Sequence, residues 1–250
     1  MKIPFSNNFF NVGDKIARNV LVSTDQGLMI VNRFDSNAEL VGHSQWLLDH
    51  GNCNTVESND CYQAIKHIHS PIIFDVGSNI GTITMWLAKL FPQGEIYSFE
   101  PQRQVFYQLC GNISINNLYN VHAFNMALND KKESIRVLEP NYFLNQDFGT
   151  FSLIESKIIS SNKELIVNSD TVDNFISTNL IQKIDLLKID AEGMDIKVLI
   201  GAKKTIENFK PVIYIEHFDN RTSCMDDIIN FLESYNYFFD QRKNNLLCQI

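Results

Sequence analysis

The feature that most constrains this chain is the stretch at residues 72–81, which reads I-I-F-D-V-G-S-N-I-G. An apolar run that passes into a glycine turn and then into a helical pattern predicts the first β–α unit of a nucleotide-binding sheet. Gly77 allows the sharp turn, and Gly81 lets the helix begin close to the strand. A dinucleotide fingerprint would have glycine in place of Asn79, so that its backbone could approach a pyrophosphate. Asn79 therefore argues against a dinucleotide site.

The sequence beyond this stretch alternates apolar runs with helical patterns. Strands are predicted at 72–76, 95–99, 121–125, 185–190 and 212–217, and helices at 81–91, 102–115, 193–208 and 223–235. Continuous apolar strands that alternate with helices are typical of a parallel sheet covered on both faces, with right-handed crossovers. The sequence therefore predicts an α/β, doubly wound fold.

Two segments lie outside this alternation. Residues 20–32 predict a β-hairpin that turns at Asp25-Gln26-Gly27, and weaker helical patterns follow near 38–48 and 60–68. We interpret 1–70 as an N-terminal extension that packs on a catalytic domain at 71–250. A long insertion after the third strand contains a predicted strand at 134–138 and a polar stretch. Connections of that length are typical of functional loops, so 140–165 is predicted to be a substrate loop or lid.

The amino-acid composition indicates which binding partners and which cellular compartment to expect. The 250 residues include 21 Lys and Arg against 29 Asp and Glu, a net charge of −8. Such a balance argues against nucleic acid as the main partner, because nucleic-acid binding depends on clustered cations. The five cysteines form no C-x-x-C pair, which suits a reducing compartment. The N-terminus has no run typical of a secretory signal, and no stretch reaches the ~18 apolar residues of a membrane span. We therefore expect a cytoplasmic protein.

The charges around the first loop fit S-adenosylmethionine (SAM), which carries an ammonium, a carboxylate, a sulfonium, a ribose and an adenine, but no pyrophosphate. Asp75 ends the first strand, where it can bind the ammonium or order water beside it. The loop N–H groups of Gly77, Ser78, Asn79 and Gly81 can meet the carboxylate near a helix N-terminus. The alternative without a ligand is a tight strand–helix turn.

The ends of the next two strands extend this site. Glu100, followed by Pro101, ends the second strand, where an acid can accept hydrogen bonds from both ribose hydroxyls. NAD would need the same acid, so Glu100 does not separate the two cofactors. Asn125, Met126 and Ala127 end the third strand and are predicted to border the adenine.

These motifs occur in the order of a known family. The segments D-V-G-S-N-I-G, S-F-E-P, K-I-D-A-E-G and P-V-I-Y-I-E-H make residues 71–217 resemble the FkbM-type SAM-dependent methyltransferases. The resemblance implies a class I methyltransferase (Rossmann-like) fold, with a seven-stranded, mostly parallel sheet whose last strand is antiparallel. It also implies O-methylation of sugars, glycans, lipids or secondary metabolites. Ser78 stands where the family usually has Ala, and 140–165 matches only loosely, which leaves the acceptor open.

Methyl transfer to a hydroxyl needs orientation of the acceptor and removal of a proton. Asp190, after the fourth strand, is expected to position the acceptor or the methionine end of SAM. His217 is the leading candidate for the base, because the unperturbed pKa of histidine lies near neutrality, and Asp190 or Glu192 could replace it. We assign no metal site. Aromatic residues of the insertion could line an acceptor pocket; they are Tyr142, Phe143, Phe148 and Phe151.

The most direct reading is a SAM-dependent O-methyltransferase that acts on a hydroxyl of a sugar, glycan or related small metabolite. The alternatives are an NAD-dependent oxidoreductase and a catalytically silent SAM-binding scaffold. The sequence does not determine the acceptor or the oligomeric state.

Overall fold

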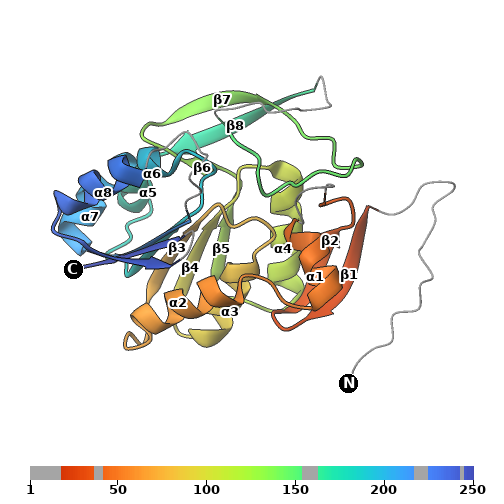
Figure 1. Ribbon diagram of the computed structural model, residues 1–250, viewed down its shortest axis with the longest axis horizontal. Coiled ribbons are helices and arrows are strands. Elements are labelled where there is room, and N and C mark those ends of the chain that lie inside the picture. The colour runs from red at the N-terminus through yellow and green to blue at the C-terminus, as the bar shows by residue number, and fades with distance from the viewer. Residues whose placement is uncertain (1–17, 37–41, 154–162, 217–224, 243–244) are drawn as a thin grey trace, which may run out of the picture.

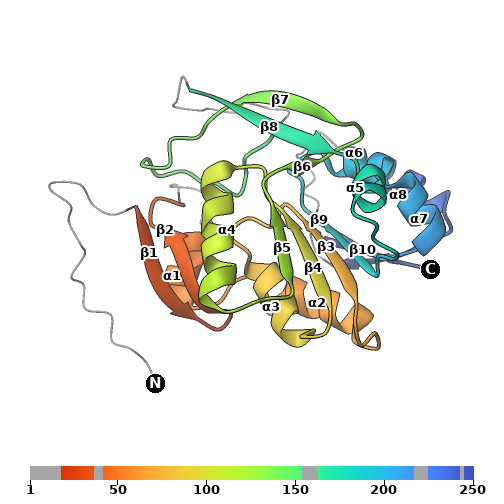
Figure 2. The same cartoon turned by 180° about the vertical axis from the view of Figure 1, so that it is seen from behind.

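The computed structural model describes residues 18–36, 42–153, 163–216, 225–242 and 245–250. Its centre is a seven-stranded sheet in the order β11–β12–β10–β9–β3–β4–β5 (Figures 1 and 2). These strands are β3 (Ile72–Val76), β4 (Glu95–Phe99), β5 (Val121–Phe124), β9 (Leu186–Ile189), β10 (Val212–Glu216), β11 (Phe238–Arg242) and β12 (Asn245–Gln249). β12 runs antiparallel to both β10 and β11, whereas β10, β9, β3, β4 and β5 run parallel to one another. The predicted class I methyltransferase sheet is confirmed, with its last strand antiparallel.

Alternate residues of each central strand reach opposite faces of this sheet. On one face, Ile73 and Ile96 pack with α2 (Thr55–Ile65) and α3 (Thr82–Leu90). On the other, Phe74 and Ile189 pack with α5 (Val172–Thr178), α6 (Asp195–Gly201), α7 (Lys203–Phe209) and α8 (Met225–Glu233). Both faces of the sheet are therefore covered, which is why its strands are apolar throughout.

Two helix predictions need correction. The single helix predicted over 193–208 is wrong, because the chain forms α6 and α7 with a break at Ala202. The carboxylate of Asp173 in α5 accepts the backbone N–H groups of Lys204 and Thr205, at 3.0 and 2.8 Å, and so caps a new helix start. The weak pattern at 60–68 overlaps α2 only as far as Ile65, and α2 already begins at Thr55.

The N-terminal hairpin forms where its turn signal lies. β1 (Asn19–Thr24) pairs antiparallel with β2 (Gly27–Asn32), and β2 packs on α4 (Arg103–Ile115). The side chain of Asn112 in α4 accepts the N–H of Ile30 at 2.5 Å, and Asn116 accepts that of Leu28 at 3.0 Å. α1 (His43–His50) follows the hairpin, within the region predicted to contain a helix. The division of the chain at residue 70 stays a prediction.

The insertion after β5 forms a second, three-stranded sheet. β6 (Ala127–Leu128) lies parallel to β8 (Glu164–Asp170), and β7 (Glu133–Leu138) lies antiparallel to it. β7 confirms the strand predicted at 134–138, whereas β8 was not predicted. The segment between β7 and β8 reaches back to the extension, where Gln146 bridges to Asp35. None of the helices in the described residues has the length and apolarity needed to cross a bilayer.

Candidate functional site

A cavity of about 930 Å³, which includes its solvent-open mouth, lies at the carboxyl ends of β3, β4 and β9. Ligand sites in open α/β sheets lie at this edge of the sheet. We call one side the cofactor wall: the residues that follow the strands of the main sheet. Its lining members are Gly77, Asn79, Glu100, Pro101, Gln102, Met126, Ala127, Leu128, Asp190, Ala191 and Glu192.

The glycine loop brings two strands of the cofactor wall into close approach. Gly77 has a φ of 75°, and a Cβ atom there would lie 1.9 Å from the backbone oxygen of Asp190. The N–H of Asp190 donates to the carbonyl of Val76 at 3.0 Å. Asn79 also has a left-handed φ, 51°, which asparagine tolerates better than most residues. The loop after β3 can therefore lie against the loop after β9 only with glycine at position 77.

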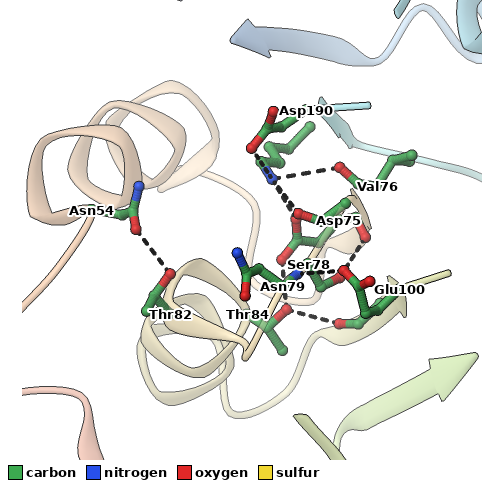
Figure 3. A network of polar contacts seen from close by, with 12 residues as sticks. Asn54, Asp75, Val76, Ser78, Asn79, Thr82, Thr84, Glu100 and Asp190 are labelled. Atoms are coloured by element: carbon green, nitrogen blue, oxygen red, sulfur yellow. Dashed lines mark hydrogen bonds and ion pairs between the residues drawn. The ribbon is translucent and has the colours of Figure 1, made fainter. Parts of the chain in front are cut away.

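Asp75 does not line the cavity. Figure 3 shows it within a network of polar contacts that includes Ser78, Thr84 and Asp190. The side chain of Asp75 is completely buried, with Oδ2 accepting the hydroxyl of Thr84 at 2.5 Å and Oδ1 lying 3.1 Å from Nζ of Lys188. Burial alone would lower the pKa of Lys188, but the attraction of Asp75 and Asp190 outweighs it and raises that pKa. Asp75 and Lys188 are therefore a buried ion pair that supports the loop.

Lys188 is a residue that the sequence analysis missed. It lies on β9, and Nζ also donates to the carbonyl oxygen of Gly77 at 3.1 Å and lies 4.0 Å from Oδ2 of Asp190. One lysine thus connects the strand end, the glycine loop and the acid after β9. The signal was present in D-L-L-K-I-D, because a lysine inside an otherwise apolar parallel strand needs a buried partner.

Glu100, for which the sequence predicts a ribose contact, lines the cavity and is held in place by the backbone. Its Oε2 accepts the N–H of Asn79 at 3.0 Å, and its Oε1 accepts that of Gln102 at 2.7 Å. Burial raises the pKa of Glu100 to about 7, although these two hydrogen bonds act in the opposite direction. The carboxylate is therefore fixed in orientation at the cavity surface.

Some of the other residues predicted to bind the cofactor line the cavity, and the rest do not. Pro101, Met126 and Ala127 line the cavity together with Gly77 and Asn79. Ser78, Gly81 and Asn125 do not line it. The hydroxyl of Ser78 donates to the carbonyl of Asp75 at 2.7 Å, inside the loop. The amide of Asn125 donates to the carbonyls of Glu100 and Pro101, at 2.9 and 3.1 Å, so it joins the ends of β4 and β5.

Two of the three predicted catalytic residues lie at the cavity. Asp190 and Glu192 line the cavity, with Glu216 from the end of β10. Glu192 has a left-handed φ of 50°, a conformation that is uncommon for glutamate and is often found at functional sites. His217 lies outside the described residues.

A further group of lining residues comes from two distant segments, and we call it the acceptor wall because the sequence predicts an acceptor pocket in the insertion. Its members are Gly42 and His43 from the extension, and Asp147, Gly149, Thr150, Phe151 and Leu153 from the insertion. Of the aromatic residues proposed for an acceptor pocket, only Phe151 lines the cavity. Tyr142 and Phe148 are buried in a core with the hairpin, and Phe143 is 60% exposed. The sequence analysis did not assign a role to Gly42 or His43.

Residues 75–239 match the model of the methyltransferase FkbM domain. The chain belongs to the FkbM methyltransferase family. The family resemblance expected from the motifs is therefore confirmed, over a range that includes the cofactor wall, the insertion, the end of β3 and the whole of β4, β5, β9 and β10.

Individual relatives of this FkbM-family chain are distant. Methyltransferase 1 of Beauveria bassiana is 25% identical over 154 residues, which are 56% of this chain and 62% of the relative. The 2-O-methyltransferase NoeI of Sinorhizobium fredii is 23% identical over 158 residues, 60% of this chain and 64% of the relative. The matched region thus spans less than two thirds of either relative.

A solved structure shares the fold. The crystal structure of methyltransferase FkbM from Methylobacillus flagellatus aligns with a TM-score of 0.53 at 17% identity, over 73% of this chain and 44% of that one.

Proposed function

We propose that this protein transfers a methyl group from SAM to a hydroxyl of a sugar, glycan or related small metabolite. The observation that carries the proposal is the charge of the cavity. Five carboxylic acids line it, and none of its described lining residues is Lys or Arg. They are Glu100, Asp147, Asp190, Glu192 and Glu216. A cationic sulfonium cofactor is attracted to such a cavity, whereas the pyrophosphate of NAD is repelled.

The chemical types of the residues in the cofactor wall match the parts of SAM. Glu100 has one backbone N–H on each carboxylate oxygen, and the remaining lone pairs of these oxygens can accept ribose hydroxyls. Met126, Ala127 and Leu128 supply apolar surface for a purine, and Asp190 and Glu192 supply negative charge for the sulfonium end. SAM, when bound, supplies a methyl group already activated for displacement.

The protein's own contribution is orientation and exclusion of water. Lys188 and Asp75 hold the glycine loop and Asp190 in one arrangement, and Phe151 and Leu153 add apolar surface to the lining of the cavity. Holding two reactants in line removes a large part of the activation free energy of a bimolecular reaction. The acceptor class is supported by the relative named as a 2-O-methyltransferase and by the acidic lining, which can accept hydrogen bonds from a polyol.

Ligand binding tests the cofactor. Thermal shift and calorimetry with SAM, its product S-adenosylhomocysteine (SAH) and NAD should show stabilisation by the first two only. At 100 times its dissociation constant a ligand adds roughly 2.7 kcal/mol to the free energy of unfolding. Stabilisation by NAD without stabilisation by SAM or SAH would reject the proposal in favour of an oxidoreductase.

Transfer of a labelled methyl group tests the reaction. A panel of neutral glycosides, sugar phosphates and polyols should give label in the neutral compounds first, because phosphates are repelled by the acidic lining. Tight cofactor binding with no transfer to any hydroxyl compound would instead support a silent SAM-binding scaffold.

A further inference from the structure

Gln102 joins the two walls of the cavity. It belongs to the cofactor wall, where its backbone N–H donates to Oε1 of Glu100 at 2.7 Å. Its side chain is buried and reaches the insertion: Nε2 donates to the carbonyl oxygen of Phe148 at 2.8 Å, and Oε1 accepts the hydroxyl of Tyr142 at 3.3 Å. Both ends of the side-chain amide are therefore used on the segment that carries part of the acceptor wall.

The place of Gln102 at the start of α4 shows that this side chain does not serve its own helix. Gln102 is the N-cap residue, with an extended backbone, and its carbonyl accepts the N–H of Phe106 at 2.8 Å. Its side chain makes no capping hydrogen bond. N-cap positions favour Ser, Thr, Asp and Asn, because these short side chains reach the free N–H groups of the first turn. A longer amide at this position gives up that cap and holds Phe148 instead.

Phe148 extends the connection through the acceptor wall. Its N–H donates to Oδ1 of Asp35 at 2.9 Å, and Oδ2 of the same carboxylate accepts the N–H of Ser44 in α1, also at 2.9 Å. Both polar backbone atoms of Phe148 are thus fixed, the carbonyl by Gln102 and the N–H by Asp35. The residues on either side of Phe148 in the chain line the cavity. The insertion is therefore held between the cofactor wall and the N-terminal extension at the point where it reaches the cavity.

We propose that Gln102 is the positioning residue that sets the acceptor wall against the cofactor wall, an inference that rests on the proposed function. Glu100, to which we assign the ribose, holds the backbone of Gln102, and the side chain of Gln102 holds Phe148. The acceptor wall is thereby placed relative to the bound cofactor. Methyl transfer requires the acceptor oxygen in line with the methyl carbon and the sulfur, so a displaced wall weakens productive binding of the acceptor.

Gln102→Asn separates this role from a purely structural one. Asparagine is a preferred N-cap residue but is one methylene too short to reach Phe148, so the variant should be as stable as the wild type in urea unfolding. With the neutral compound that takes up most label in the transfer panel, its KM should rise about tenfold. The dissociation constant of SAH, measured by calorimetry, should stay within about twofold, because the backbone N–H that holds Glu100 is unchanged.

Gln104→Asn is the matched control for this variant. Gln104 lies in the first turn of the same helix, and its Oε1 accepts a hydrogen bond from the guanidinium of Arg18 at 2.8 Å, but it does not line the cavity. The KM of this variant for the same compound should equal that of the wild type. A purely structural role of Gln102 would lower the amount of active protein, and so the apparent kcat, and would leave KM unchanged.

Hydrogen exchange of the backbone amides, measured by NMR in the SAH complex, gives a second readout that needs no acceptor. In Gln102→Asn the N–H of Phe148 should exchange about tenfold faster, because the carbonyl of the same residue has lost its donor. The N–H of Ile30, which donates to Asn112 of α4, should keep its rate, since α4 itself is unchanged.

An unchanged KM in Gln102→Asn, or an unchanged exchange rate at Phe148, would overturn the proposal. An SAH affinity that falls together with the acceptor affinity would also overturn it, because Gln102 would then act on the cofactor. The proposed function would survive each of these results, since SAM binding and label transfer by the wild-type protein test it separately.

Discussion

The two walls of the cavity are built in different ways. The cofactor wall comes from the ends of adjacent parallel strands, and backbone hydrogen bonds and the Asp75–Lys188 ion pair set its geometry. The acceptor wall joins segments more than one hundred residues apart, and the contacts that link them include the carboxylate of Asp35 and the backbone hydrogen bond from Gln146 to Phe34. The difference teaches that the geometry of the cofactor wall follows from the sheet itself, whereas that of the acceptor wall depends on contacts between segments distant in the sequence.

The variant with the largest expected effect on stability removes the buried cation, Lys188. Lys188→Met leaves Asp75 charged and buried, so the free energy of unfolding should fall by about 4 kcal/mol. Lys131→Met is the control, because Lys131 pairs with Glu133 at the surface and such pairs contribute at most about 1 kcal/mol. Urea unfolding measures both. Equal, small losses would show that the ion pair does not support the loop.

Gly77 tests the close approach of the β3 and β9 loops. Gly77→Ala should cost about 3 kcal/mol, because it combines an unfavourable φ with a Cβ clash against Asp190. Gly51→Ala separates the two causes, since Gly51 has the same φ of 75° and no atom within 4 Å of an added Cβ. That variant should lose only about 1 kcal/mol. Similar losses in both variants would show that the clash is relieved.

Glu100 tests the ribose contact within the cofactor wall. Glu100→Gln should weaken SAH binding about 30-fold, or roughly 2 kcal/mol, because hydrogen bonds to a charged acceptor contribute that much. Glu95→Gln is the control, since Glu95 begins the same strand at its opposite end and is about half exposed. Calorimetry measures both. Unchanged affinity in Glu100→Gln would place the ribose elsewhere.

The pH dependence of binding follows from the pKa of Glu100, which burial raises to about 7 from a usual 4.5. In the ligand-free protein the folded state holds the extra proton between these two values, so this residue's contribution to stability falls as pH rises from 4.5 to 7. Ribose hydroxyls favour the ionised form, so SAH affinity should rise about tenfold from pH 6 to pH 8. Calorimetry at both pH values checks this, and Glu100→Gln should lose that dependence.

The smallest expected effect lies on the acceptor wall. Phe151→Ala should raise the KM for the acceptor about fivefold, or roughly 1 kcal/mol, through lost apolar contact, and leave SAH affinity unchanged. Phe143→Ala is the control, because Phe143 is mostly exposed and does not line the cavity. A weakened SAH affinity in Phe151→Ala would show that the two walls are not independent.

Much of the cofactor wall could be predicted because its signals are local. The apolar strands, the glycine turn and the acid after β4 each occupy a few consecutive residues, and parallel strands bring their carboxyl ends to one edge. The same local rules missed β8, the break between α6 and α7, and the start of α2. These features depend on partners far along the chain, such as Asp173 for the start of α7.

The sequence by itself determined the sheet, its order of elements and the edge at which a ligand can bind, because side-chain periodicity and turn chemistry act over short distances. Only the tertiary structure decided which way polar side chains face. It turned Asp75 toward Lys188 and away from the cavity, used Asn125 to join two strand ends, and placed His43 and Asp190 in the lining of one cavity. The physical reason is that a buried polar group is oriented by the nearest partner in space, which the linear sequence does not specify.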